Sequence, residues 1–268
     1  QSQSMFARRV FELLASNTIV VSNFSRGMRL LFGDLVISSD NSHQTSKRLD
    51  EICNNESHYR KLRLLGLRKV MSEHTYTDRL SFILSKINND QYTKTLPLVE
   101  LFAKVSSLDE FESIIRSYEE QKYLNKKLIV WADFEQPIKL ENDSVIIYKE
   151  AADVLSDLLR LQNDSALFGM LSSEDYYGSH YLTDLAQASQ YAKYDAYGKA
   201  TFYQYVSKVT LENDGCQYKQ TTLLDIRSSL IKSSALNENS LKLFLDQNYT
   251  ISAIKMLATD EFNYCKKG

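Results

Sequence analysis

The stretch ALFGMLSSEDYYG, residues 166–178, joins an apolar run to a polar end and decides how the second half of the chain is interpreted. Residues 166–171 predict a short buried strand, because the run is apolar and is followed by turn-forming residues. Open α/β sheets bind ligands at the carboxyl ends of their strands. The adjacent carboxylates of Glu174 and Asp175 are ligands that a divalent cation on a diphosphate requires. A strand ending in a solvated acidic turn is the alternative.

A longer segment, SSEDYYGSHYLTDLAQASQYAKYDAYGKATFY (residues 172–203), resembles the family 2 (GT-A) glycosyltransferases. Those enzymes end a strand in an Asp-x-Asp metal motif, and a subgroup continues with a Tyr-Tyr-Gly turn, a helix and a Gly-Lys. The resemblance implies Mn or Mg on a sugar-nucleotide diphosphate, with Glu174 and Asp175 as its ligands. The sequence departs from the motif at its first acid, where Ser172 stands, and at its second, where Glu174 stands.

Composition bounds the class of protein. The chain has 268 residues, 43% hydrophobic and 25% charged, which predicts a globular protein with one large or two small domains. A net charge of −2 does not favour a nucleic-acid or anionic-membrane partner. No apolar run approaches the ~18–20 residues of a membrane span, and no signal peptide is visible. Three scattered cysteines indicate a reducing compartment, so we expect a cytoplasmic protein: Cys53, Cys216 and Cys265.

The first part of the chain alternates between helical and strand patterns. Apolar residues at helical spacing predict a helix over residues 5–16, which Asn17 can end. Short β-branched strands are expected at residues 18–22 and 35–38, and this order implies a parallel sheet. Further helices are expected over residues 41–54, over 57–73 and from about Thr75, with Thr75 and Asp78 as a capping pair.

Residues 4–88, which include SMFARRVFELLASNTIVVSNFSRGMRLLFGDLVISS and RKLRLLGLRKVMSEHTYTDRL, also resemble a known family. They look like the last part of a GT-B glycosyltransferase of the spore-maturation-protein-like group (glycosyl transferases group 1). The resemblance implies that Glu12 bonds the donor ribose and that Arg8 and Arg9 face its diphosphate. The family's Gly-x-Pro turn is replaced at Asn17 and Ile19. The alternative is a solvated Arg8–Glu12 pair on a helix surface, worth about 0.2–0.5 kcal/mol.

A GT-B enzyme closes two Rossmann-like lobes over its substrates, and only half of the second lobe is matched here. We therefore expect a fragment of a longer chain, or a decayed one, with its missing N-terminal part as a partner. The polar stretch 88–95, NNDQYTKT, is the expected linker. The sequence thus predicts an α/β protein: a partial Rossmann-like GT-B remnant over residues 1–90 and a GT-A-like mixed-sheet domain over 91–268.

The second part keeps the block order of the GT-A family. Strands are expected at residues 96–105, 127–132 and 144–148, with helices at 108–118 and 151–161. Asp133 matches the family's nucleotide-contacting Asp, although an Asp after a strand is also a common turn residue. Later strands are expected at residues 201–211, 217–226 and, as the last strand, 251–257. The family's Glu-Asp pair, whose Asp is the catalytic base, is here Glu238-Asn239, and an amide is no base.

Two functions remain open from the sequence. The first is a bacterial-type glycosyltransferase of cell-surface or spore glycan synthesis, moving a sugar from a nucleotide-sugar donor to a glycan acceptor. Donor contacts would come from Asp133, Arg8 and Glu12, and Glu238 is the only acid left near the base position. The second is a non-catalytic module that binds a glycan, a nucleotide or a partner enzyme. Ser172 and Asn239 favour a degenerate active site, so we expect this chain alone to be inactive.

Overall fold

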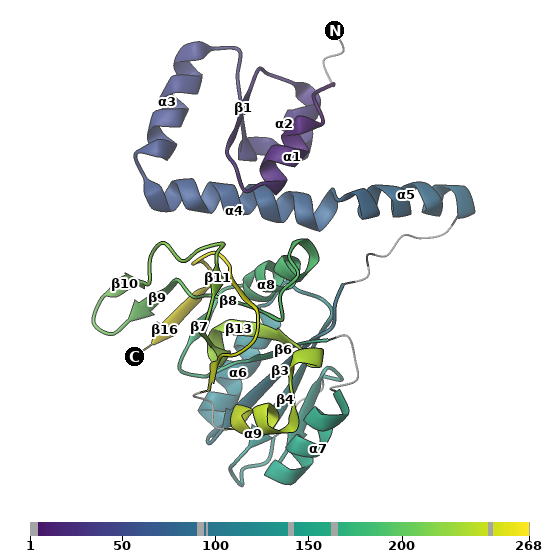
Figure 1. Cartoon of the computed structure of the whole chain (residues 1–268), viewed down its shortest axis with the longest axis vertical. Coiled ribbons are helices and arrows are strands. Elements are labelled where there is room, and N and C mark those ends of the chain that lie inside the picture. The colour runs from purple at the N-terminus through teal and green to yellow at the C-terminus, as the bar shows by residue number, and fades with distance from the viewer. Residues whose placement is uncertain are drawn as a thin grey trace. The chain divides into compact units, whose positions relative to one another are not determined.

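The computed structural model describes residues 5–89, 94, 96–138, 142–161, 166–245 and 249–267, without the side chains of residues 160 and 161. It divides into two compact units, unit 1 (Gln1–Lys94) and unit 2 (Thr95–Gly268). Each is of the α/β class, as the sequence predicts (Figure 1). Most of the expected linker, residues 88–95, lies outside the described residues.

Unit 1 is built around two short parallel strands, β1 (Val20–Ser22) and β2 (Val36–Ser38), with Val20 paired to Val36. Helix α1 (Arg9–Ala15) packs its buried Val10 and Leu14 into the core that also holds Phe32. Helices α4 and α5 follow one another along one side of this unit (Figure 1). The remaining elements are α2 (Arg26–Phe32), η1 (Gly33–Leu35), α3 (Ser42–Cys53), α4 (Glu56–Glu73) and α5 (Tyr76–Asn88). Helix α2 was not foreseen from the sequence.

Two local predictions for unit 1 are confirmed. Asn17 ends the first helix in the left-handed region, with φ 55°, and its N–H donates to the Leu14 carbonyl at 3.1 Å. An asparagine tolerates this conformation better than most other residues that are not glycine, so it can end the helix at this position. Thr75 and Asp78 form a capping box at the start of α5, each side chain accepting the other's backbone N–H.

Unit 2 is organised on an eight-stranded mixed sheet in the order β11-β15-β8-β13-β6-β3-β4-β5. Strands β3 (Val99–Val105), β4 (Lys126–Ala132), β5 (Val145–Tyr148) and β6 (Leu167–Met170) are parallel. Strand β13 (Ser229–Lys232) runs antiparallel between β6 and β8 (Ala196–Gly198). Beyond β8 the sheet continues with β15 (Met256–Ala258) and ends at the edge strand β11 (Gln220–Thr221).

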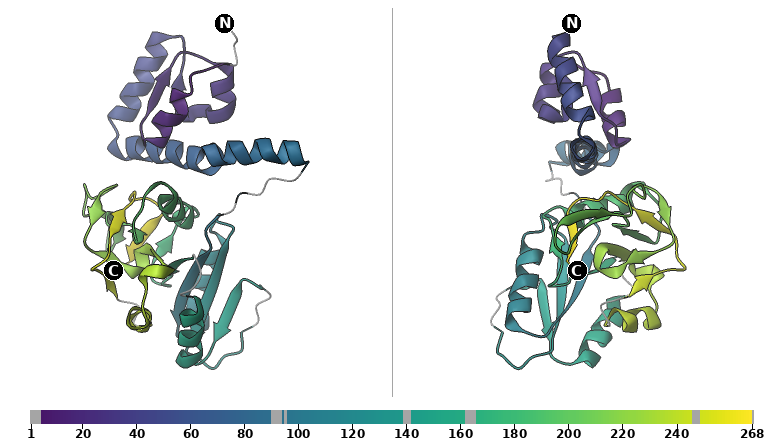
Figure 2. Two further views of the ribbon diagram at one scale, coloured as in Figure 1. Left: turned by 45° about the vertical axis from the view of Figure 1, so that its right-hand side comes forward. Right: turned by 90° about the vertical axis from the view of Figure 1, so that its left-hand side faces the viewer.

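Successive side chains of β3 pack into two different hydrophobic cores, one on each face of the sheet. Both faces of the sheet are therefore apolar. Leu101 and Ala103 pack in the core that contains helices α6 (Leu108–Glu119) and α8 (Tyr181–Tyr191). Phe102 packs in the other, with α7 (Ala151–Leu161) and α9 (Glu238–Phe244). Figure 2 shows the twisted sheet and its helices from two further sides.

Three strand predictions in the tail are wrong. Residues 217–226 form two separate short strands, Gln220–Thr221 and Leu224–Asp225, followed by the start of a 3-10 helix at Ile226. Residues 201–211 do not form one strand: they form part of a hairpin of β9 (Phe202–Tyr205) and β10 (Val209–Glu212), because a turn separates the two runs. The expected last strand, 251–257, is divided between β14 (Thr250–Ile251) and β15, and a further strand, β16 (Tyr264–Lys267), follows it. Strand β16 pairs with β9 and with β7 (Tyr176–Tyr177). A separate two-stranded sheet pairs β12 (Leu224–Asp225) with β14, and the short helices η2 (Ile226–Ser228) and η3 (Ser233–Ala235) flank β13 along the chain.

Candidate functional site

Unit 1 has a pocket of about 240 Å³ where the start of α1 lies against the junction of α4 and α5. Arg8 and Glu12, both predicted donor contacts, line it. The other lining residues come from all three helices: Phe11, Ala15, Val70, Met71, His74, Thr75, Tyr76 and Arg79. The pocket therefore combines an apolar floor with two arginines, one carboxylate and an imidazole. That is a suitable lining for a ligand with an apolar or aromatic ring and an anionic group.

The two predicted residues are paired with each other across one helical turn. Arg8 Nε lies 2.9 Å from Glu12 Oε1, and the side chains are 75% and 51% exposed. An exposed pair of this kind contributes little to stability, so both groups can exchange their partner for a ligand at small cost. Their donor-binding role stays a prediction.

His74 is the C-cap of α4 and also lines the pocket. Its ring packs edge-on against Phe11 and Phe32, with centroids 5.4 and 5.6 Å away. Burial lowers the pKa of the imidazole below its ordinary value. Within the described part of the chain, its buried Nε2 makes no hydrogen bond. A buried nitrogen without a partner is costly, so it favours a ligand or water at this position.

Arg79 is the second cation of the pocket and was not singled out from the sequence. Its guanidinium stacks on the Phe11 ring at 4.4 Å from the centroid. The capping box fixes the start of α5 and thereby the direction of Arg79, one turn further on. A second depression in unit 1, of about 430 Å³, lies at the carboxyl ends of β1 and β2 and is lined by Ser38, Asp40, Asn41 and Arg48 among others.

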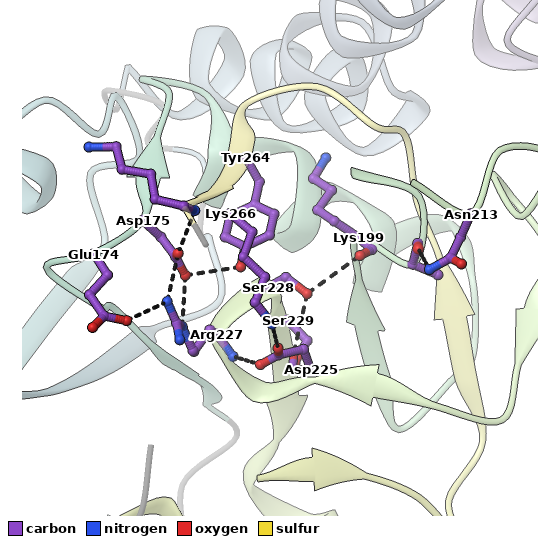
Figure 3. Close-up of polar contacts among 12 residues, drawn as sticks. Glu174, Asp175, Lys199, Asn213, Asp225, Arg227, Ser228, Ser229, Tyr264 and Lys266 are labelled. Carbon is purple, nitrogen blue, oxygen red and sulfur yellow. Dashed lines mark hydrogen bonds and ion pairs between the residues drawn. The ribbon is translucent and has the colours of Figure 1, made fainter. Parts of the chain in front are cut away.

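In unit 2, the predicted acids Glu174 and Asp175 face an arginine that sequence reasoning missed (Figure 3). Arg227, in η2 just before β13, donates from Nε to Asp175 Oδ2 at 2.8 Å and from Nη2 to Oδ1 at 2.6 Å. Nη2 also reaches Glu174 Oε2 at 3.3 Å. The Asp175 and Arg227 side chains are 0% and 8% exposed, whereas that of Glu174 is 70% exposed. Burial opposes the charged guanidinium, yet the net effect of Asp175 is to raise the pKa of Arg227.

Tyrosines complete the surroundings of Asp175. Tyr264 of β16 donates its hydroxyl to Asp175 Oδ2 at 3.0 Å, and the Lys267 N–H donates to Oδ1 at 3.2 Å. Tyr177 donates to the Arg227 carbonyl at 3.0 Å and accepts from the Ser172 N–H at 3.1 Å. Burial raises the pKa of Tyr177 and Tyr264, so both hydroxyls remain protonated donors.

The carboxylate oxygens of Glu174 and Asp175, as the fold arranges them, do not fit Mn or Mg as metal ligands. Each oxygen of Asp175 already accepts two hydrogen bonds, and a guanidinium lies on the face that the two carboxylates share. Among the described residues, no group of three or more His, Cys, Asp or Glu side chains is arranged to hold a metal ion. The metal-binding role of Glu174 and Asp175 stays a prediction.

A second buried ion pair lies beside this cluster. Lys199, the Lys of the Gly-Lys in the resemblance, donates to Asp260 Oδ2 at 2.8 Å, with side chains 0% and 4% exposed. Burial raises the pKa of Asp260, and the ammonium of Lys199 opposes that rise. Ser228 connects the two clusters, because its hydroxyl donates to the Lys199 carbonyl at 3.4 Å (Figure 3).

The remaining predicted residues lie apart from this network. Asp133 follows β4, while Glu174 and Asp175 follow β6, and β3 lies between those parallel strands. Asp133 is 60% exposed and lies 4.0 Å from Lys104 Nζ, which also covers the Trp131 ring. Glu238 begins α9 and pairs with Lys242 at 2.6 Å. That hydrogen bond lowers the pKa of Glu238, which is unfavourable for a general base. The roles of Asp133 and Glu238 stay predictions.

Comparison with known proteins supports the glycosyltransferase resemblance for the first part of the chain. Residues 1–85 match the family model described as "Glycosyl transferase-like". That match covers unit 1 up to α5 and includes every residue lining the first pocket. No curated protein matches the chain.

Among solved structures, S. aureus TarS 1-349 is similar, with 11% identity and a TM-score of 0.39. The similarity covers 63% of this chain and 60% of that one, so the chain spans less than two thirds of its length. A TM-score below 0.5 does not establish a shared fold. No helix of the described residues combines the length and the apolar character needed to cross a membrane.

Proposed function

We propose that this chain is part of a glycosyltransferase and that unit 1 binds its nucleotide-sugar donor. One observation carries the proposal: Arg8 and Glu12 line a pocket within the residues that match the glycosyl transferase-like family model. Glu12 would accept hydrogen bonds from the ribose hydroxyls of the donor, while Arg8 and Arg79 would face its diphosphate. The unsatisfied Nε2 of His74 supports a polar ligand group in the same pocket.

The proposal also covers the cellular process and compartment in which the enzyme would act. A bacterial-type enzyme of cell-surface or spore glycan synthesis, working in the cytoplasm, would take the sugar from this donor and pass it to a glycan acceptor. The resemblance of residues 4–88 to the spore-maturation-protein-like group supports that setting. The described cysteines are free thiols, which suits a reducing compartment.

We further propose that this chain does not transfer sugar by itself, and that unit 2 is a non-catalytic module. Ser172 and Asn239 replace two acids of the GT-A pattern. Glu238, the remaining acid near the base position, is exposed and paired with Lys242. A general base needs a pKa near the working pH, and the pKa of Glu238 is shifted away from it.

Calorimetric titration of the full chain with UDP, GDP and their sugar conjugates tests the donor site. Glu12→Gln is expected to weaken nucleotide binding about tenfold, or about 1.4 kcal/mol. Glu56→Gln is the matched control, because Glu56 pairs with Arg60 in the same i,i+4 geometry outside the pocket. Equal affinity of the wild type and both variants would contradict the donor site. A donor-hydrolysis assay with turnover by the chain alone would contradict the proposed inactivity.

A further inference from the structure

The acids of unit 2 already have a cation built into the chain. Arg227 contacts Asp175 through two parallel hydrogen bonds of 2.8 and 2.6 Å, the bidentate geometry that matches a guanidinium to a carboxylate. Its Nη2 also reaches Glu174 at 3.3 Å. One planar cation thus connects both carboxylates that the GT-A resemblance assigns to Mn or Mg.

The hydrogen-bonding capacity of Asp175 is fully used. A carboxylate offers about four lone-pair positions, and four donors reach those of Asp175. They are Arg227 Nε, Arg227 Nη2, the Tyr264 hydroxyl and the Lys267 N–H. A hard divalent cation would be coordinated by the same carboxylate oxygens, so it would have to displace the guanidinium.

The guanidinium is held in place by the strand order. The acids follow β6, and Arg227 lies two residues before the start of β13, the antiparallel neighbour of β6. The Arg227 N–H donates to Asp225 at 2.9 Å, and Asp225 is itself paired with Lys266 of β16 at 3.0 Å. An arginine stays protonated at any pH at which the protein is folded, so a rise in pH within that range would not release the acids.

We propose that the guanidinium of Arg227 takes the place of a divalent metal ion in unit 2, so that Glu174 and Asp175 bind no such ion. Nη1 of Arg227 makes no hydrogen bond with the described residues, which leaves its two N–H groups for an anionic oxygen of a ligand. The proposal does not depend on the donor pocket in unit 1, and either can fail alone.

The test is titration of the full chain with MnCl₂, followed by the electron paramagnetic resonance signal of free Mn²⁺ and by thermal unfolding with Mn²⁺ or EDTA. The wild type is expected to show no saturable Mn²⁺ site at these acids and the same unfolding temperature in both buffers. Saturable Mn²⁺ binding by the wild type that Glu174→Gln abolishes would overturn the proposal.

Removing the guanidinium sharpens the test. Arg227→Gln is expected to acquire Mn²⁺ binding about tenfold tighter than any binding by the wild type, and to unfold at a higher temperature with Mn²⁺ than with EDTA. Adding Glu174→Gln should remove that gain. A folded Arg227→Gln chain that Mn²⁺ neither binds nor stabilises would contradict the proposal. If this variant does not fold, the wild-type and Glu174→Gln titrations decide the question.

Discussion

The two units hold comparable arginine–carboxylate pairs in opposite environments. Arg8 and Glu12 of unit 1 are 75% and 51% exposed and line an open pocket, whereas Arg227 and Asp175 of unit 2 are 8% and 0% exposed and are surrounded by other donors. The exposed pair is weak and can exchange partners with a ligand. The buried pair is fixed, since separating it leaves an uncompensated charge. The same kind of ion pair therefore suits the proposed binding site in unit 1 and a structural network in unit 2.

The largest expected effect is a difference in stability between variants of the two acids that contact Arg227. Asp175→Asn should lower the free energy of unfolding of unit 2 by about 3–5 kcal/mol, because it leaves the buried guanidinium without its charged partner. Glu174→Gln is the matched control and should change it by no more than about 1 kcal/mol, because Glu174 is 70% exposed. Native-state hydrogen exchange of peptides from unit 2 measures both. Similar losses in the two variants would show that burial does not distinguish these acids.

A smaller effect is expected at the start of α5, which lines the proposed donor pocket. Thr75→Ala removes the capping box that starts α5, and should destabilise unit 1 by about 1 kcal/mol. Ser85→Ala, on the exposed part of the same helix, should change stability by less than about 0.5 kcal/mol. Hydrogen exchange of α5 peptides reports the difference. Unchanged exchange in Thr75→Ala would show that Lys94, which also bonds Asp78, holds the helix start without the threonine.

The smallest expected effect is a pH dependence of unit 1. Burial, supported by Lys69 and Arg79, lowers the pKa of His74 against the opposing charges of Glu73 and Asp78. Between the ordinary pKa of about 6.5 and the lowered one, the unfolded chain binds a proton that the folded chain does not. The free energy of unfolding should therefore fall as the pH falls below about 6.5, and stay constant for this group above it. Denaturant titrations at two pH values measure this slope, and His74→Phe should reduce it. An equal slope in that variant would assign the dependence to other groups.

Local patterns predicted much of the fold and one part of the candidate site. The helix at Ala151–Leu161 has the predicted bounds, and the Thr75–Asp78 cap forms as predicted. These features depend on residues within a turn or two of one another, so spacing along the chain is enough to reveal them. Helix α2 and strand β16 were missed because both are short and lack a clear period.

The sequence by itself determined the α/β alternation, the acidic turn after β6 and the glycosyltransferase resemblance of its first part. Only the tertiary structure decided what the acids contact. Arg227 lies 52 residues from Asp175, and Tyr264 lies 89 residues from it. The order of β6, β13, β7 and β16 brings these residues together, and such pairing depends on packing of the whole sheet. The one available signal was a charged residue, Arg227, two residues before the strand β13, and the sequence does not reveal its partner.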